Sequence, residues 1–152
     1  MARIPEAPQA GSPFWWFWER FTSFHELAYK ASGGRLGGRA YGAPVVLVDS
    51  VGRKSGKRRT HPLICDEQGE SIIVVASKGG VDRHPAWYLN LMAHPETEIN
   101  WRGERRRVRA REAEGEERER LWRRMVDVYR PYAHYQSRTE RRIPVIVLEP
   151  AE

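Results

Sequence analysis

The chain has 152 residues, of which 40% are hydrophobic and 30% charged, with a formal net charge of +6. This length and balance are typical of one soluble domain with its own core, and they exclude a disordered chain. A single cysteine, Cys65, excludes an intrachain disulfide and a zinc-finger framework. The five histidines stand singly, so we expect no metal site. The positive charge favours an anionic partner, which is nucleic acid, an anionic membrane or a phosphorylated small molecule.

The N-terminal part divides into a tail and an aromatic helix. Residues 1–12 contain two prolines and few apolar side chains, so we expect a flexible tail there. Residues 13–152 are predicted to form a single domain. It begins with a helix at Pro13, because Phe and Trp recur at helical spacing before Gly33-Gly34. Two interpretations of this aromatic face stay open: packing on the core, or contact with a membrane interface or an apolar substrate.

Short strands, turns and helices alternate in the rest of the chain. Strands are predicted at 45–48, 60–65, 71–77, 97–101, 104–112 and 144–148, with turns at 52–56, 67–69 and 102–103 and helices at 85–93 and 116–129. Residues 71–77 are apolar on both faces, which places them in the centre of a sheet. Hairpins with helices between them predict an α+β, mainly β fold, in which a small antiparallel barrel has helices packed outside.

The segment 52–59, Gly-Arg-Lys-Ser-Gly-Lys-Arg-Arg, has the chemistry of an anion site. Five of the seven residues from 53 to 59 are basic, and no acid occurs between Ser50 and Asp66. Two glycines allow a tight turn that exposes backbone N–H groups, while arginine and lysine suit phosphate and carboxylate oxygens. A solvated hairpin turn is the alternative interpretation. The spacing is not that of a P-loop.

Two further segments place polar groups at the ends of predicted elements. Ser77 and Lys78 follow the central strand within Ala-Ser-Lys-Gly-Gly, and binding groups often lie at such ends. The helix that begins at Pro85 offers free backbone N–H groups to an anion. On its face, Trp87 either stacks on a flat heterocycle or packs in the core.

Two repeating patterns carry a second set of candidates. Tyr129, Tyr132 and Tyr135 recur every third residue, either as a substrate-binding stripe or as packing. The arginines at 105, 107, 109 and 111 share one strand face, opposite Val108 and Ala110. We expect a solvated face there, balanced by Glu104, Glu112, Glu114, Glu116, Glu117 and Glu119; contact with a polyanion or phospholipid is the alternative. These glutamates dilute the positive charge, so we expect no nucleic-acid partner.

Taken in order, these segments resemble the deazaflavin-dependent nitroreductase family, whose members use coenzyme F420. The resemblance rests on 52–56 (GRKSG), 59–63 (RTHPL), 76–80 (ASKGG), 84–91 (HPAWYLNL) and 94–96 (HPE). The ending, 129–136 (YRPYAHYQ) with 142–145 (RIPV), is similar to the quinone-reducing branch of that family. The similarity runs from about Arg35 to Pro150. It implies a split β-barrel related to flavin-reductase folds, which agrees with the predicted hairpins.

The resemblance implies a cofactor and a reaction. The cofactor would be reduced coenzyme F420, an 8-hydroxy-5-deazaflavin with a phosphate and an oligoglutamate tail. The reaction would be hydride transfer from C5 of the deazaflavin to a flat acceptor, such as a menaquinone-like quinone or a nitroaromatic or nitroimidazole compound. The coenzyme supplies the hard chemistry, while the protein supplies position and electrostatics.

The resemblance also implies site residues. The coenzyme would be bound by Arg53, Lys54, Ser55, Arg59, Thr60, His61, Pro62, Leu63, Ile64, Val75, Ala76, Ser77, Lys78, Ala86, Trp87, Tyr88, Leu89, Asn90 and Tyr132. Within this set, Arg53, Lys54, Ser55 and Arg59 would hold the phosphate and tail. Ser77 and Lys78 would bond the polar edge of the ring. The catalytic candidates are Ser77, Tyr129 and Tyr135, with Tyr135 as the proton donor.

Several alternatives remain open. An oxidoreductase that uses FMN, or a non-catalytic protein that binds coenzyme F420, would share the same barrel. We expect a cytoplasmic monomer or homodimer, attached peripherally to the inner face of the cell membrane if its aromatic helix binds lipid. One departure from the family pattern is the acid Asp49 in Val-Asp-Ser-Val, which would place a negative charge near the proposed anion site.

Overall fold

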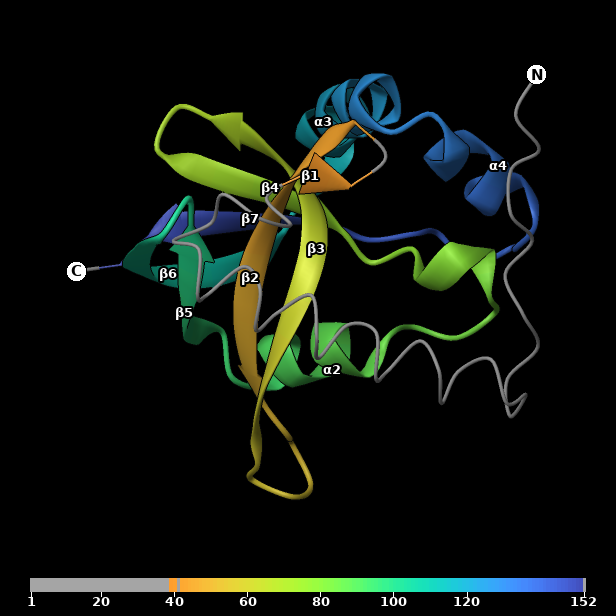
Figure 1. Ribbon diagram of the computed structural model, residues 1–152. Coiled ribbons are helices and arrows are strands. Elements are labelled where there is room, and N and C mark those ends of the chain that lie inside the picture. The colour runs from red at the N-terminus through yellow and green to blue at the C-terminus, as the bar shows by residue number, and fades with distance from the viewer. Residues whose placement is uncertain (1–38, 41, 152) are drawn as a thin grey trace.

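The computed structural model describes residues 39, 40 and 42–151. The predicted tail and the predicted aromatic helix therefore lie outside the described residues. Figure 1 shows the described part as a strongly curved sheet with helices around it.

Six antiparallel strands close into a barrel. A short strand β1 (Arg39–Ala40) precedes β2 (Ala43–Val51), β3 (Arg58–Gln68), β4 (Ser71–Val75), β5 (Glu96–Trp101), β6 (Glu104–Glu112) and β7 (Val145–Pro150). The strand order is β1-β2-β3-β4-β7-β6-β5, and a further pairing of β2 with β5 closes the ring. At this closure Leu47 pairs with Asn100 and Val48 with Ile99. The predicted mainly-β fold with a small barrel is confirmed.

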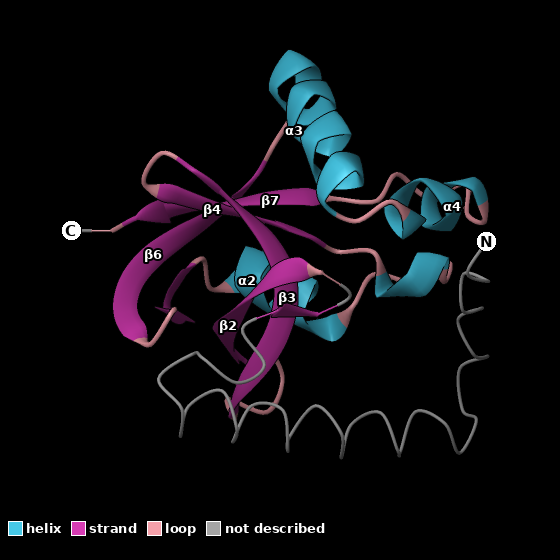
Figure 2. Ribbon diagram, turned by 45° about the horizontal axis from the view of Figure 1, so that its top comes forward, coloured by secondary structure: helices cyan, strands magenta, loops and turns pink. Residues whose placement is uncertain are grey.

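The helices lie at one end of the barrel and on its outer surface. The 3-10 turn η1 (Lys78–Gly80) leads to α2 (Ala86–Ala93), and α3 (Gly115–Val128) is followed by α4 (Pro131–Ser137). Figure 2 shows α2 beside the barrel strands β2 and β3, and α3 and α4 together on the side of β7. This arrangement brings η1 and α4 close to each other, as Figure 1 also shows.

Two apolar clusters share the central strand β4. Its side chains Ile72 and Val74 point into the barrel, where Trp87 and Leu91 of α2 join them. Ile73 and Val75 point outward to α3 and α4. The prediction that this segment is central and apolar on both faces is confirmed, because burial on both faces requires an apolar side chain at every position. Burying each large side chain of this kind stabilises the fold by roughly 1.5–3 kcal/mol.

The helix predicted at 116–129 is observed as α3, and one of its faces packs against the outer apolar cluster. Leu121 and Met125 are buried, and Trp122, Val126 and Tyr129 pack against the same cluster. Arg118 is also buried, and its Nη2 donates a hydrogen bond of 2.8 Å to the carbonyl oxygen of Ile143. Its guanidinium lies over the ring of Trp122, 5.1 Å from the centroid.

Several predicted boundaries are corrected. The strand predicted at 45–48 runs from Ala43 to Val51, because the buried polar residues Asp49 and Ser50 find hydrogen-bond partners on β3. The strand predicted at 60–65 extends to Gln68, so the turn predicted at 67–69 is instead made by Gly69 and Glu70. Gly69 has a φ of +60°, which suits a tight hairpin turn. The strand predicted at 71–77 ends at Val75, since Ser77 has helical dihedral angles.

Candidate functional site

Three backbone N–H groups of the β2–β3 loop form hydrogen bonds inside the loop. The Gly52 N–H bonds to the Lys57 carbonyl oxygen at 2.8 Å, and the Gly56 N–H to the Gly52 carbonyl oxygen at 2.8 Å. The Lys57 N–H bonds to Ser55 Oγ at 3.2 Å. The expectation that this turn exposes its N–H groups to an anion is therefore wrong for these three groups. Anion binding at this loop depends on its side chains.

Asn90 ties the loop to α2. Its buried side-chain oxygen Oδ1 accepts a hydrogen bond from the Arg53 N–H at 3.1 Å and another from Arg53 Nη1 at 3.0 Å. The structure thus brings together two predicted coenzyme residues that are 37 positions apart. One acceptor fixes both the backbone and the guanidinium of Arg53, so the loop has a defined position relative to the helix.

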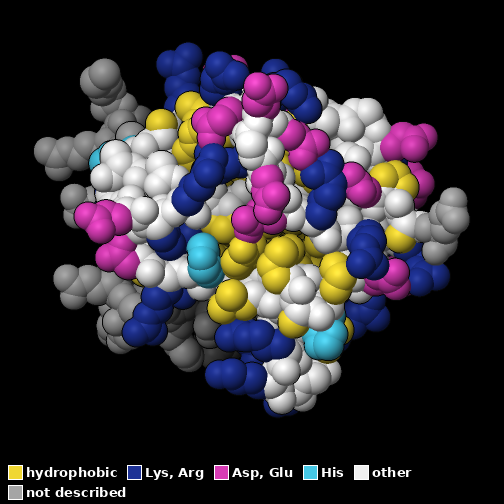
Figure 3. Space-filling view, turned by 180° about the vertical axis from the view of Figure 1, so that it is seen from behind, with side chains coloured by type: hydrophobic (Ala, Val, Ile, Leu, Met, Phe, Trp, Pro, Cys, Tyr) yellow, Lys and Arg dark blue, Asp and Glu magenta, His cyan; other side chains and the backbone are white. Residues whose placement is uncertain are grey.

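The loop carries cations without acidic partners. Within residues 42–151, Lys54, Lys57 and Arg59 are exposed and form no ion pair. The loop is the lowest part of the barrel in Figure 1, and the lower end of the space-filling view shows basic side chains with no acidic ones among them. Higher on the same face, basic and acidic side chains alternate (Figure 3). Charge that is not neutralised is available to a phosphate or carboxylate.

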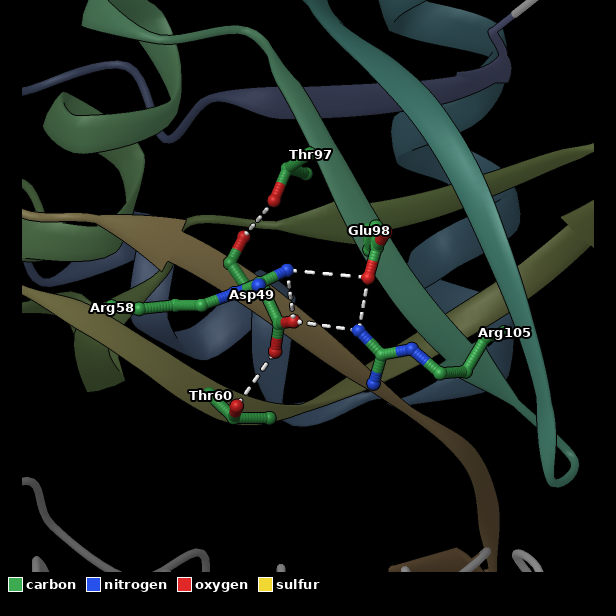
Figure 4. A network of polar contacts seen from close by, with 6 residues as sticks. All are labelled: Asp49, Arg58, Thr60, Thr97, Glu98 and Arg105. Carbon is green, nitrogen blue, oxygen red and sulfur yellow. Dashed lines mark hydrogen bonds and ion pairs between the residues drawn. The ribbon is translucent and has the colours of Figure 1, made fainter.

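Asp49 does not weaken this site, because its charge is already paired. Its carboxylate lies 3.0 Å from Arg58 Nη2 and 3.2 Å from Arg105 Nη2. It also accepts a 2.6 Å hydrogen bond from the hydroxyl of Thr60. Both arginines contact Glu98 as well (Figure 4). The network spans β2, β3, β5 and β6 across the closure of the barrel.

The arginine face of β6 is confirmed as outward and solvated, but its partners differ from those predicted. Val108 and Ala110 are buried on the opposite face. Arg105 pairs with Asp49 and Glu98, Arg109 with Glu96, and Arg111 with Glu117 and Glu149. Among the described residues, Glu117 is the only one of the predicted glutamates that pairs with this face. Neighbouring strands supply the others, because acids on paired strands lie closer than acids further along the chain.

The predicted residues of β3 divide between its two faces. The side chain of His61 lies 3.0 Å from Ser50 Oγ, and Leu63 packs against the barrel cluster. Thr60 bonds Asp49, and Ile64 packs against the outer cluster beneath α3 and α4. Pro62 pairs with Leu47 in the register of β2 and β3. The segment 60–64 therefore does not present all of its side chains to one ligand.

The segment after β4 has an unusual backbone. Lys78, Gly79 and Gly80 have φ values of +45°, +63° and +80°. A positive φ is uncommon for lysine, and such conformations persist where the surroundings hold them. A Cβ atom on Gly80 would lie 2.5 Å from the carbonyl oxygen of Tyr135, so only glycine allows this approach to α4. The structure thereby brings the predicted Ser77–Lys78 and Tyr135 segments together. Ala76 is buried in the barrel cluster and Val75 in the outer cluster.

Arg141 holds this segment, and the sequence analysis missed it. Its guanidinium donates to the carbonyl oxygens of Ala76 at 3.2 Å, Ser77 at 2.6 Å and Val81 at 2.7 Å. A fourth contact, of 3.2 Å, joins Nη1 to Nδ1 of His84. Burial, together with the neighbouring Arg141, lowers the pKa of His84. Because the partners are mostly backbone carbonyls, no side-chain motif could have indicated this role.

The predicted residues of α2 have different environments. Trp87 is 8% exposed and packs in the barrel core, so its ring is not presented to a ligand. Ala86 is exposed, and Tyr88 and Leu89 are half-buried. The hydroxyl of Tyr88 donates to Glu112, and its ring lies 4.7 Å from that of His84. Partial burial and the bond to Glu112 raise the pKa of Tyr88 to about 12.

The three tyrosines form one aromatic cluster. The ring of Tyr132 lies 4.9 Å from that of Tyr129 and 6.3 Å from that of Tyr135. The hydroxyl oxygens of Tyr129 and Tyr135 are 3.2 Å apart, so one donates to the other. Tyr132 is 4% exposed and also contacts Trp122, and burial raises the pKa of its hydroxyl. Tyr129 and Tyr135 are half-buried and stand nearer the surface than Tyr132.

Cys65 is fully buried in the barrel, and burial raises the pKa of its thiol. It therefore packs as a small hydrophobic residue. In the described part of the chain, no helix is long and apolar enough to cross a membrane.

Comparison with known proteins places this geometry in a family. The model of the F420H(2)-dependent quinone reductase family matches residues 22–150. F420H(2)-dependent quinone reductase Rv1261c of Mycobacterium tuberculosis is 40% identical over 129 residues, which cover 82% of this chain and 86% of that protein. A second protein of M. tuberculosis, Rv3178, is 46% identical over 107 residues, which cover 70% of this chain and 90% of that protein.

A solved structure supports the same assignment. The structure of an F420-H2 dependent reductase, FDR-A, is 45% identical in sequence and superposes with a TM-score of 0.65, over 70% of this chain and 94% of that one. The predicted resemblance and the split-barrel fold are thereby confirmed. The chain belongs to the F420H(2)-dependent quinone reductase family, as a reductase whose cofactor is coenzyme F420.

Proposed function

We propose that this chain reduces quinones, and flat nitroaromatic acceptors as well, by hydride transfer from reduced coenzyme F420. The observation that carries the proposal is the β2–β3 loop, where Lys54 and Lys57, like Arg59 at the start of β3, have no acidic partner among the described residues, and whose position Asn90 fixes. This loop fits a coenzyme that is strongly anionic at one end. When bound, the reduced deazaflavin supplies a hydride from its C5 atom.

The loop holds the anionic end of the coenzyme. Arg53 and Arg59 offer planar guanidinium groups, and Lys54 offers a point charge, to the phosphate and the tail carboxylates. Ser55 adds a hydroxyl beside them. Because Arg53 is already bonded to Asn90, less side-chain freedom is lost when an anion binds.

The ring of the coenzyme lies toward the segment after β4 and the exposed side of α2. Ser77 and Lys78 supply polar groups to the edge of the ring, and Ala86 and Leu89 cover it. Trp87 supports this surface from the core, where it packs beneath α2. The protein thereby orients the ring and excludes water from the reacting face.

The acceptor lies against the tyrosine cluster. Tyr129 and Tyr135 share one hydrogen bond between their hydroxyl groups, so a proton given to the acceptor by Tyr135 can be replaced through Tyr129. Tyr132 packs behind both rings and fixes their orientation. We assign the proton donation to Tyr135 and the positioning of the acceptor to Tyr129.

The test is a fluorescence titration of the purified chain with coenzyme F420, run beside FMN at the same salt concentration. Binding of the deazaflavin alone, followed by menadione reduction with the reduced coenzyme, supports the proposal. Binding of FMN alone would assign the barrel to flavin chemistry. Binding of coenzyme F420 without reduction of any quinone or nitro acceptor would leave a non-catalytic binding protein.

Tyr135→Phe tests the proton donor. We expect turnover to fall by about tenfold, since general acid catalysis typically contributes more than that and Tyr129 remains nearby. The affinity for the coenzyme should stay unchanged, which the same titration measures. Equal turnover in the variant would leave Tyr135 as a packing residue.

A further inference from the structure

Arg141 lies between α4 and β7, outside the segments that bind the coenzyme in the proposal above. Its guanidinium nevertheless makes four polar contacts, all with the segment that joins β4 to α2. The side chain is half-buried, and burial lowers its pKa. Removing a guanidinium from water costs free energy unless hydrogen bonds to the protein replace those to water.

The segment that Arg141 holds contains one residue, Lys78, whose backbone conformation is uncommon for a residue with a side chain. Three successive residues, Lys78 to Gly80, have positive φ values. The internal hydrogen bonds that close this turn are from Gly80 N–H to Ser77 at 2.9 Å and from Val81 N–H to Lys78 at 3.3 Å. The carbonyl oxygen of Ser77 accepts from Gly80 and from Arg141 at once. Arg141 therefore anchors the turn at its first residue and, through Val81, at its end.

The anchor also connects the two halves of the proposed site. Thr139, two residues before Arg141, donates from Oγ1 to Asp82 Oδ1 at 2.6 Å, and the Arg141 N–H bonds to Thr139 Oγ1 at 3.2 Å. The Arg141 carbonyl oxygen accepts from Gln136 Nε2 at 2.8 Å, which ties it to α4. Arg141, together with Thr139 and Gln136, thus connects the tyrosine helix to the segment that contains Ser77 and Lys78.

We propose that Arg141 is a positioning residue, whose guanidinium holds residues 76–84 in the conformation in which Ser77 and Lys78 meet the coenzyme beside the tyrosine cluster. The inference rests on the proposed function for the identity of the ligand. A lysine would keep the positive charge, but it cannot reach three carbonyl oxygens and an imidazole in one plane. Arg141→Lys therefore keeps the positive charge and removes the hydrogen-bond geometry, so the variant tests the geometry alone.

The matched control is Arg142→Lys. Arg142 is adjacent in sequence, its side chain is 64% exposed, and its Nη2 pairs with Glu119 at 2.7 Å on the surface. Within the described part of the chain, its side chain forms no hydrogen bond or ion pair with residues 76–84. The two variants thus change the same residue type by the same substitution, and they differ in whether the segment loses its anchor.

The first measurement is amide hydrogen exchange without coenzyme. In Arg141→Lys the N–H groups of Gly80 and Val81 should exchange about tenfold faster or more, because the turn opens locally, while those of β3 and β4 keep their wild-type rates. Arg142→Lys should leave all of these rates unchanged. Wild-type exchange at Gly80 and Val81 in Arg141→Lys would overturn the inference, and so would equal acceleration throughout the barrel, which would indicate a general loss of stability.

The second measurement is the affinity for coenzyme F420 and the split between KM and kcat. If the segment is in the binding conformation about a tenth of the time, the apparent Kd and the KM for the coenzyme rise about tenfold, while kcat at saturation stays within about threefold. A Kd within twofold of the wild type would overturn the inference. Failure of the wild-type chain to bind the coenzyme is a different result, because it would overturn the proposed function while the exchange measurement still reports on the anchor.

Discussion

Two arginine-rich regions of this molecule differ in what their charge is able to do. The β2–β3 loop and the outer face of β6 have similar compositions, and both are exposed. On β6 the arginines at 105, 109 and 111 pair with acids from neighbouring strands. On the loop, Lys54 and Lys57 have no such partners among the described residues, nor does Arg59 at the start of β3, whereas the adjacent Arg58 pairs with Asp49 and Glu98. The number of arginines therefore says little about anion binding until the strand pairing is known.

The difference follows from the sheet. A residue on β6 lies opposite β5 and β7, whose outward positions carry Glu96, Glu98 and Glu149. The loop extends beyond the paired parts of β2 and β3, so no strand of the described residues lies beside it (Figure 1). Exposed ion pairs contribute little stability, typically below about 1 kcal/mol each. Their main effect here is to make β6 a poor surface for a polyanion.

The largest expected effect is on coenzyme binding at the loop. Arg53→Ala together with Lys54→Ala should weaken binding of coenzyme F420 by about 30-fold or more, which corresponds to about 2 kcal/mol for two charge-assisted contacts. Fluorescence titration measures it. The matched control is Arg107→Ala together with Arg109→Ala on β6, which should change the affinity by less than about twofold, since the proposed site does not include the outer-face arginines. An equal loss of affinity in both double variants would contradict the proposed difference between the two regions.

The next effect is on stability at the barrel closure. Asp49 is 6% exposed and pairs with two arginines that are themselves about half-exposed. Asp49→Ala should lower the free energy of unfolding by about 1–2 kcal/mol, because Thr60 loses its acceptor while the arginines regain water. Urea unfolding measures it, with Arg107→Ala as a control expected within about 0.5 kcal/mol. The affinity for the coenzyme should not weaken. If Asp49→Ala has the stability of the wild type, the polar network at the barrel closure does not stabilise the fold.

The smallest expected effect is on the pH dependence of the free energy of unfolding. The pKa of Glu98 is lowered by its hydrogen bonds to Arg105 and that of Glu117 by Arg111. Because the folded-state pKa lies below the ordinary value of 4.5, the unfolded chain binds more protons as the pH falls. The stabilising contribution is therefore complete above about pH 4.5 and is lost as the pH falls through the folded-state pKa values.

Glu98→Gln together with Glu117→Gln should show a smaller loss of stability than the wild type between pH 6 and pH 3, measured by urea unfolding. The loop has no carboxylate, so the variant with Arg53→Ala and Lys54→Ala should keep the wild-type dependence on acid. An altered dependence in the loop variant would mean that the loop does pair with acids in solution.

The sequence predicted the fold well wherever alternation decides it. The period of two in β6 and the two-sided apolar run of β4 led directly to their observed faces. The ends of β2 were missed because Asp49 and Ser50 look like loop residues, and their burial depends on partners on β3. The helix α4 was missed because Pro131 interrupts the pattern after α3, although proline suits the first turn of a new helix.

The residue types of the candidate site were predicted from the sequence, but the hydrogen bonds that join its parts were not. The basic loop and the tyrosine triplet stand out in the sequence, but the bond of Arg53 to Asn90 joins residues far apart in the chain. Arg141 was missed for a different reason, since backbone carbonyls carry no sequence signal. Trp87 was left open between core and ligand because an aromatic residue on a short helix suits both.

The central claim is that the β2–β3 loop recognises the anionic end of coenzyme F420. The most direct measurement is the ratio of two dissociation constants, one for the intact coenzyme and one for the same deazaflavin without its phosphate and glutamate tail. In the wild-type chain we predict that the intact coenzyme binds at least about 30-fold more tightly. In the variant with Arg53→Ala and Lys54→Ala this ratio should fall toward one. A variant that keeps the wild-type ratio would contradict the account.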